Sequence, residues 1–322
     1  MKAIVQEGYG SPDRLKLREI ETPAAGDDGV LVEVHAASVN ALDWHLARGV
    51  PIFLRLLEAI GAPKHRIRGV DLAGRVTAVG KNVRRFKPGD EVLGAADGSF
   101  AEFTVTTEKR LAPKPPGITF EQAATLNIAG LTALQGLRDR ARVRAGQRVL
   151  VNGAGGGVGT FAVQIAKWLG AHVTAVTRAG SADLARSLGA DEVIDHDAED
   201  FTSRRDRWDV IFDIGGTQPF SRCRRVMGPD GILVAVGGPT GRWLAPAGRL
   251  LQAVMLWPLT RGRVVPFVAR SDPEGLTLLA GLVESRTITP VIDRRFALSE
   301  TVEAVRHLGA GHTRGKVVIN TR

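Results

Sequence analysis

A glycine cluster between a short apolar run and a helical pattern constrains the fold of this chain more than any other feature. Val149, Leu150 and Val151 form an apolar run typical of a buried parallel strand. Residues 153–159 are rich in glycine, and apolar residues at helical spacing follow until Gly170. A strand, a glycine turn and a helix in this order predict a unit in which the helix begins at the turn.

The same turn predicts a binding site for the phosphates of a dinucleotide. Glycine has no side chain, so a pyrophosphate can approach the backbone, and the helix N-terminus offers free N–H groups and the positive end of its dipole. An ordinary tight turn is the alternative interpretation. In the best register, which has alanine at the first glycine position, the residues predicted to line the site are Ala154, Gly156, Gly157, Val158 and Gly159.

The residues after the next strand indicate which dinucleotide binds. Residues 172–177 read as that strand, and Arg178 follows. A site for NAD usually has an acidic residue here, roughly 20 residues beyond the glycines, to bind the ribose 2′-hydroxyl. Arginine instead pairs with a 2′-phosphate through a planar fork of donors, and Ser181 lies just beyond it. The sequence therefore favours NADPH, with a solvent-facing arginine at a strand end as the alternative.

Length and charge limit the classes of protein that remain. A chain of 322 residues with a mean hydropathy of −0.01 is long enough for two domains with full cores. No stretch is long and apolar enough to cross a bilayer, and the first residues do not read as a signal peptide, so we expect a cytoplasmic protein without membrane contact. The net charge is +9, but scattered arginines and few aromatics argue against nucleic acid as a partner.

Two patterns of secondary structure divide the chain. Short β-branched runs separated by glycine and proline fill the first 120 residues and predict a small barrel or sandwich, which an apolar segment at 51–64 interrupts. From Thr119, a predicted helix start, strands alternate with helices, so we expect an α/β fold with a doubly wound parallel sheet. The strands predicted for that sheet are 148–152, 172–177, 191–195, 208–214 and 231–236.

After about residue 265 the chain is expected to return to the first domain. Residues 287–292 and 316–320 read as strands, and a helix capped by Ser299 is expected between them. The predicted domains are therefore residues 1–121 with 264–322, and residues 122–263.

Six short motifs occur in order along the chain, at 34–43, 69–74, 86–92, 129–133, 156–159 and 315–318. On these motifs the chain resembles the medium-chain dehydrogenase/reductase superfamily over essentially its whole length. Within that superfamily it is similar to the zinc-less quinone oxidoreductase branch, in particular the group related to reticulon-4-interacting protein. The resemblance implies a GroES-like β-barrel catalytic domain interrupted by a Rossmann domain, with the cofactor in the cleft between them.

Three positions bear on the catalytic zinc of the zinc-dependent relatives. Those relatives bind zinc through two cysteines and the histidine of a Gly-His-Glu motif. The matching residues here are Asn40, Val70 and Ile128, and none of them replaces a thiolate or an imidazole. Cys223 is the single cysteine, which also excludes a cysteine-based structural zinc site and an internal disulfide. We therefore expect no metal.

The resemblance also implies roles for individual side chains. Asn40 and Asp43 match an Asn-x-x-Asp pair near the nicotinamide: Asn40 is expected to donate to an oxyanion, and Asp43, ionised at neutral pH, to orient a neighbour. His45 is expected to donate a proton or hydrogen-bond the acceptor, or else to be structural. Lys316 is expected to reach the cofactor phosphate or to cap the last strand. The other residues expected to bind cofactor are Thr132, Arg178, Ser181, His196, Gly215, Val236, Gly237 and Gly238.

The absence of zinc ligands narrows the chemistry. Without a Lewis acid, hydride transfer to conjugated, electron-poor acceptors stays accessible. The resemblance implies NADPH-dependent reduction of quinones or α,β-unsaturated carbonyls, by a homodimer that pairs through an edge strand near 263–268. Three alternatives stay open: a pathway-specific enoyl reductase, a zinc-type alcohol dehydrogenase, and a non-catalytic protein that binds NADPH or RNA.

Overall fold

The computed structural model describes residues 1–50, 66–237, 247–259 and 263–321. The chain divides into two units, Met1–Leu131 with Arg270–Arg322, and Thr132–Ala269. The apolar segment at 51–64 and Gly238, for which the sequence makes predictions, lie outside the described residues.

Antiparallel strand pairs form the frame of the first unit. Its strands are β1 (Lys2–Gln6), β2 (Leu15–Glu19), β3 (Gly29–Val39), β4 (Asp71–Val79), β5 (Glu91–Ala95), β6 (Phe103–Thr107), β7 (Leu111–Pro113), β14 (Ile292–Ala297) and β15 (Lys316–Asn320). The main sheet has the order β14-β15-β3-β4-β5-β7, with β6 also paired to β3, and β1 pairs with β2. Alternate residues of β3, such as Val30, Val32 and Val34, point into the core.

Side-chain caps fix where the helices of the first unit begin. The Thr119 hydroxyl accepts a hydrogen bond from the Gln122 N–H, which confirms the helix start predicted there. Asp272 caps the next helix in the same way through the Gly275 N–H, and Pro273 occupies the first helical position. The helices of this unit are α1 (Ala41–Arg48), α3 (Phe120–Ala124), α9 (Pro273–Glu284) and α10 (Thr301–Gly309), and a π-helical turn spans Leu126–Gly130.

In the C-terminal segment the position of one expected strand and the cap of one expected helix differ from the prediction, whereas the helix itself is present. The strand expected at 287–292 lies later in the chain, as β14, because Pro290 has no N–H to donate to a strand ladder. The helix expected from Ser299 begins at Thr301, after a tight turn. In that turn the Glu300 carboxylate, and not the serine hydroxyl, accepts a backbone hydrogen bond.

The second unit is a doubly wound parallel sheet, as the sequence predicts. Its strands are β8 (Arg148–Asn152), β9 (His172–Thr177), β10 (Glu192–Asp195), β11 (Trp208–Asp213), β12 (Met227–Ala235) and β13 (Val264–Pro266). All its pairs are parallel, and the order is β10-β9-β8-β11-β12-β13. This order, with the first strand next to the fourth, is that of dinucleotide-binding sheets.

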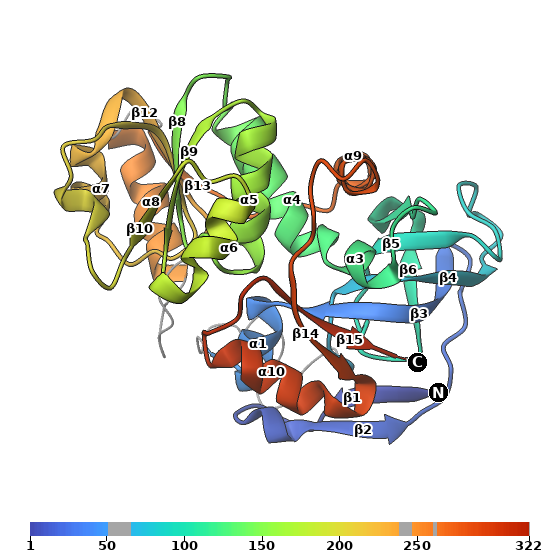
Figure 1. The fold of residues 1–322 in the computed structure, drawn as a ribbon. Coiled ribbons are helices and arrows are strands. Elements are labelled where there is room, and N and C mark those ends of the chain that lie inside the picture. Colours follow the sequence, from blue (N-terminus) through green and yellow to red (C-terminus); the bar gives the residue numbers. More distant parts are fainter. Residues whose placement is uncertain (51–65, 238–246, 260–262, 322) are drawn as a thin grey trace. The chain divides into compact units, whose positions relative to one another are not determined.

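Helices cover both faces of this sheet. They are α5 (Gly157–Trp168), α6 (Ala182–Ser187), α7 (Phe220–Arg225) and α8 (Ala247–Leu259), and α4 (Leu131–Leu134) lies at the junction of the units. In Figure 1, α5 and α6 lie on one face, and α7 and α8 lie on the other. Because β13 is hydrogen-bonded to β12, the second unit extends beyond residue 264, where the sequence places the boundary.

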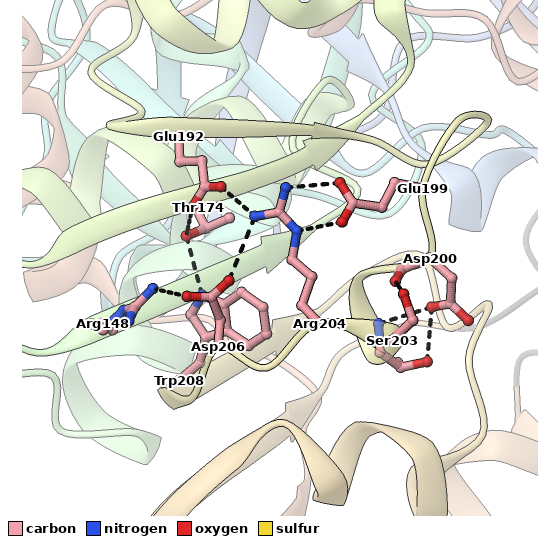
Figure 2. A network of polar contacts seen from close by, with 10 residues as sticks. Arg148, Thr174, Glu192, Glu199, Asp200, Ser203, Arg204, Asp206 and Trp208 are labelled. Atoms are coloured by element: carbon pink, nitrogen blue, oxygen red, sulfur yellow. Dashed lines mark hydrogen bonds and ion pairs between the residues drawn. The ribbon is translucent and has the colours of Figure 1, made fainter.

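A set of ion pairs ties the loop before β11 to the amino-terminal ends of the strands (Figure 2). The Arg204 guanidinium binds both oxygens of Glu199, at 2.7 and 2.8 Å, and also contacts Glu192. It lies 3.8 Å from Asp206, which accepts a 2.9 Å hydrogen bond from Arg148. We call these five residues the Arg204 network. It lies at the amino-terminal ends of the strands, and the glycine turn lies at their carboxyl-terminal ends, because Arg148 begins β8 and the turn follows the end of β8.

Candidate active site

The glycine turn after β8 packs so closely that side chains are excluded from part of it. A Cβ on Gly159 would lie 2.1 Å from the Gly153 carbonyl oxygen, and a Cβ on Gly155 would lie 2.7 Å from Thr177 Oγ1. Gly156, the residue that caps α5, has open space around its Cα, since a Cβ there would meet nothing nearer than 3.8 Å. The turn is therefore sealed by protein on one side and open at the start of α5, as a phosphate site requires.

The other residues predicted for this turn lie at the start of α5 and beneath it. Gly157 and Val158 are its first residues, where backbone N–H groups have no acceptor one turn earlier. Ala154 is fully buried, and its N–H donates to the Val176 carbonyl at 3.0 Å. That bond ties the turn to β9 and sets the direction in which α5 starts.

Three residues predicted to hold the adenosine end of the cofactor come together at the ends of β9 and β10. Arg178 directly follows β9 and is exposed. Ser181 lies against the glycine turn, because a Cβ on Gly155 would come within 3.0 Å of its Cβ. His196 follows β10, and its N–H donates to the Thr177 carbonyl at 3.0 Å. An arginine, a hydroxyl and an imidazole thus surround the end of β9 beside the open turn.

The strand order reverses between β8 and β11, and polar groups meet there. Asn152, the last residue of β8, donates to Asp213 Oδ1 at 2.8 Å, and both side chains are buried. The Gly215 N–H donates to the Asn152 carbonyl, and the Val236 N–H donates to the Asp213 carbonyl. Gly237 packs against the preceding loop so closely that a Cβ would lie 2.5 Å from a carbonyl oxygen. Ligands of doubly wound sheets bind at this reversal point.

The remaining predicted residues fall in both units. Thr132 lies in α4 as the first residue of the second unit and is largely buried. Asn40, Asp43, His45 and Lys316 belong to the first unit. Asn40 and Asp43 lie at the start of α1, His45 lies in its last turn, and Lys316 begins β15.

Asp71 is the centre of a buried polar cluster in the first unit. It begins β4 and is fully buried. Its Oδ2 accepts hydrogen bonds from Ser38 Oγ at 2.7 Å and Asn40 Nδ2 at 2.9 Å. Its Oδ1 accepts from Asn127 Nδ2 at 2.9 Å and from the Ile128 N–H at 3.1 Å. Four hydrogen bonds compensate the cost of burying this carboxylate. We call Asp71, its four donors and Lys316 the Asp71 cluster.

The amide of Asn40 uses both of its hydrogens within this cluster. Nδ2 donates to Asp71 and, at 3.2 Å, to the Ser38 carbonyl. An amide nitrogen has two hydrogens to donate, so none is left for an acceptor outside the protein. The oxyanion-donor role expected for Asn40 does not fit this geometry, which favours a positioning role instead.

Asp43 departs from the ionised state expected from the sequence. Burial raises the pKa of its carboxyl to about 7, and the negative charge of Asp71 adds to the increase. The Asn40 N–H, which donates to Oδ2 at 2.8 Å, and the positive charges of Lys316 and Arg68 oppose it. The other oxygen, Oδ1, is buried without a hydrogen-bond partner among the described residues. Asp43 therefore keeps its proton up to a pH well above that at which a free carboxyl ionises.

His45 is held as a neutral acceptor. Burial lowers the pKa of its imidazole, and nearby Arg48 lowers it further. Nδ1 lies 3.0 Å from the Val50 carbonyl oxygen, so in the neutral ring Nδ1 carries the hydrogen and Nε2 carries the lone pair. In this tautomer Nε2 can only accept a hydrogen bond, and the oxygen of a quinone or enone also only accepts. The geometry therefore argues against both the proton-donor role and a hydrogen bond to the acceptor oxygen, and it favours the structural alternative.

The sequence analysis missed Asp71, Asn127, Asn152 and Asp213 as functional candidates. Each is a polar residue that lies fully or nearly buried. Asp71 and Asp213 stand directly beside apolar strand residues in the sequence. A charged residue inside or at the end of such a run is the signal that marks a buried carboxylate with dedicated partners.

The part of the chain that the structure describes contains neither a metal cluster nor a membrane-spanning helix. Within the described ranges, no three side chains of His, Cys, Asp or Glu lie close enough to hold a metal ion. The helices of the described residues are also too short or too polar to cross a membrane.

Comparison with known proteins gives matches along the whole chain. Residues 26–116 match the family model described as "Alcohol dehydrogenase GroES-like domain", and residues 188–319 match the one described as "Zinc-binding dehydrogenase". "Quinone-oxidoreductase QR1, chloroplastic" of Triphysaria versicolor is 32% identical, over 99% of this chain and 98% of that protein. "NADPH-dependent alkenal/one oxidoreductase, chloroplastic" of Arabidopsis thaliana is 34% identical, over 99% of this chain and 79% of that protein.

A solved structure matches the fold equally completely. The quinone oxidoreductase from Coxiella burnetii superposes with a TM-score of 0.90 at 31% sequence identity, and the match covers 100% of this chain and 99% of that one.

Proposed function

Because the chain belongs to the medium-chain dehydrogenase/reductase family, in its quinone oxidoreductase branch, we propose that it transfers a hydride from NADPH to a quinone or an α,β-unsaturated carbonyl. When bound, NADPH supplies the hydride, and the acceptor takes up that hydride and one proton to give the hydroquinone or the saturated carbonyl. Relatives named for quinones and for alkenals or alkenones support this pair of acceptor classes.

One observation carries the choice of NADPH. Arg178 and Ser181 stand at the end of β9, next to a glycine turn that is open at the start of α5. The guanidinium and the hydroxyl offer several donors to a 2′-phosphate, and no carboxylate occupies the position after β9 that would repel it. The name of the Arabidopsis relative supports the same cofactor.

We propose that no metal takes part. Asn40, Val70 and Ile128 stand at the positions that bind zinc in the zinc-dependent relatives, and none provides a thiolate or an imidazole. Conjugated acceptors are electron-poor without a Lewis acid, so hydrogen bonds are enough to stabilise the charge that develops on their oxygen. This argument favours a quinone or enone reductase over a zinc-type alcohol dehydrogenase.

The test of this function is NADPH and NADH oxidation against a panel of quinones, enals and enones, with metal analysis of the same preparation. We expect turnover with NADPH and no loss of rate after treatment with a chelator. Protein that binds NADPH but reduces no acceptor would favour the alternative of a non-catalytic NADPH-binding protein. If the protein contains stoichiometric zinc and needs it for turnover, the alternative of a zinc-type alcohol dehydrogenase would be favoured. Activity confined to one thioester-linked enoyl substrate would indicate a pathway-specific enoyl reductase.

A single substitution tests whether the Arg178 side chain itself contributes to NADPH binding. Arg178→Ala removes charge-assisted hydrogen bonds of about 1.5–3 kcal/mol, so KM for NADPH should rise roughly 10- to 100-fold while KM for NADH changes little. Arg186→Ala is the matched control, because this exposed arginine on α6 pairs with Asp183 and is assigned no cofactor role. Equal KM values in Arg178→Ala and the wild type would remove the basis for NADPH preference.

We also propose a homodimer that associates through the β13 edge. β13 is the last strand of its sheet, and apolar side chains nearby in sequence are exposed. They are Leu251, Val254 and Met255 on α8, and Val268 just after β13. Light scattering should give twice the mass of one chain, and Val268→Lys should give a monomer. The cytoplasmic location stays a prediction, because both plant relatives are chloroplast proteins by name.

A further inference from the structure

The Lys316 side chain carries a positive charge into the interior of the first unit. Only 3% of it is exposed. Its ammonium donates to Asn40 Oδ1 at 2.6 Å and to the Val39 carbonyl at 3.2 Å, and it lies 3.6 Å from Asp71 Oδ2. The ammonium is thus surrounded by three oxygens, of which two accept hydrogen bonds and the third, on the Asp71 carboxylate, lies at ion-pair distance.

These contacts allow the Asn40 amide only one orientation. Its oxygen faces Lys316, which can only donate, and its nitrogen faces Asp71, which as a carboxylate only accepts. A flipped amide would direct hydrogens at the ammonium and an oxygen at the carboxylate. Lys316 and Asp71 together therefore fix this side chain as neither would alone.

Asn40 in turn sets the start of α1. It is the residue that caps this helix, and its backbone N–H donates to Asp43 Oδ2 at 2.8 Å. His45 follows on the next part of the helix. A displacement of Asn40 would therefore be passed to Asp43 and His45, the two other side chains predicted to be catalytic.

We propose that Lys316 is a positioning residue, which acts with Asp71 through Asn40 to hold the first turn of α1, and with it Asp43 and His45, in the geometry that the reaction needs. This proposal deepens the function proposed above and rests on it. It replaces the contact with a cofactor phosphate that the sequence suggested for Lys316, because the ammonium hydrogens already have acceptors in the protein.

The charges around Asp43 give this proposal a readout that does not depend on turnover. Asp43 is faced by Asp71 of β4, by Lys316 of β15 and by Arg68, which precedes β4. The two cations lower the pKa of Asp43, and the carboxylate raises it. Removing the Lys316 charge should therefore move the titration of Asp43 to higher pH.

The experiment compares Lys316→Gln with Lys316→Met in the full chain. Glutamine can still donate to Asn40 Oδ1 but has no charge, whereas methionine cannot donate. We expect kcat to fall at least tenfold in Lys316→Met and by less in Lys316→Gln. The dissociation constant for NADPH, measured by fluorescence, should change less than twofold in both. The Asp43 titration, followed by carboxyl NMR, should shift upward by about one pH unit in both.

The outcomes separate the two roles of Lys316. A tenfold or larger loss of NADPH affinity with kcat unchanged would overturn the proposal in favour of a phosphate contact. Equal kcat in the wild type and Lys316→Met would also overturn it. If Lys316→Met does not fold, Ser38→Ala serves in its place, because it removes one donor to Asp71 and should lower kcat without changing NADPH affinity.

A wild-type protein that reduces no acceptor would refute the proposed function. The NADPH affinity and the Asp43 titration of the two variants would then still decide where Lys316 acts.

Discussion

The Asp71 cluster of the first unit and the Arg204 network of the second both bring opposite charges together, but only one of them is in contact with water. Lys316 and Asp71 are 3% and 0% exposed. Arg204 is 20% exposed and its partner Glu199 is 42% exposed. In the Arg204 network water can replace a lost partner, and in the Asp71 cluster it cannot. Breaking an ion pair should therefore cost far more stability in the first unit than in the second.

The difference also agrees with where the two sets lie. The Arg204 network holds the amino-terminal edge of the parallel sheet, away from the strand ends where ligands bind such folds (Figure 2). The Asp71 cluster includes Asn40, the cap of the helix that carries two of the predicted catalytic side chains. Burial makes the second arrangement rigid, which is what positioning requires.

The largest effect should follow from removing the charge of Asp71. Asp71→Asn leaves the Lys316 ammonium buried without its counter-charge. The NH₂ group of the new amide would also face some of the four groups that donate to Asp71, so donor would meet donor. The free energy of unfolding should therefore fall by about 3–5 kcal/mol. Urea unfolding at neutral pH measures it. A loss below about 1 kcal/mol would mean that the buried pair behaves like an exposed one, and the comparison would fail.

A smaller, pH-dependent effect is expected at Asp43. Its pKa is about 7 in the folded protein and 3.8 in the reference state, so the folded state binds the proton more tightly. The wild type should therefore lose stability relative to Asp43→Asn as pH rises from about 4 to about 7, by up to about 4 kcal/mol, and the difference should be constant above about pH 8. Urea unfolding at a series of pH values tests this, and parallel stability curves would contradict the raised pKa.

Breaking the exposed network should cost less. Arg204→Met removes the contacts with Glu199 and Glu192 but leaves carboxylates that water can solvate, so we expect a loss of about 1 kcal/mol or less. NADPH affinity should be unchanged, since the network lies at the edge of the sheet opposite to the glycine turn. A loss as large as that of Asp71→Asn would show that exposure does not decide the energetics here.

Salt should produce the smallest effect. Raising the ionic strength from about 0.1 to 1 M shortens the Debye length from about 10 to 3 Å and screens exposed pairs most. The difference in unfolding free energy between the wild type and Arg204→Met should shrink by a few tenths of a kcal/mol. The difference for Asp71→Asn should not change, because its charges do not reach water. An equal response of both pairs would contradict the assigned difference.

Local patterns were enough to predict much of the second unit. β8 and β9 begin and end where the sequence predicts, because β8 contains an uninterrupted apolar run, β9 is rich in β-branched residues, and glycine or charged residues flank both. β14 was misplaced, since the segment before it is apolar but contains Pro290, and the strand itself carries polar residues at an exposed edge. The boundary predicted at residue 121 differs from the one at Leu131, because the π-helical turn of Leu126–Gly130 bonds to Asp71.

The candidate site was harder to predict than the fold. The glycine turn could be located, and Arg178 could be proposed as a phosphate ligand, because both depend on neighbours in the sequence. The role of Lys316 could not, because its partner Asn40 lies 276 residues away, and no local pattern indicates such a pairing. The raised pKa of Asp43 was missed for the same reason, since it depends on burial by distant segments.

The distance between Asn40 and Lys316 also has a consequence for biosynthesis. The whole second unit, Thr132–Ala269, lies between these two residues in the chain. A ribosome makes proteins from the amino end, so the nucleotide-binding sheet is complete in sequence before the lysine is added. Asp71 and its donors are therefore synthesised early and lack the Lys316 ammonium during most of translation. The newly made first unit is then a natural client for chaperones, and the second can fold before it.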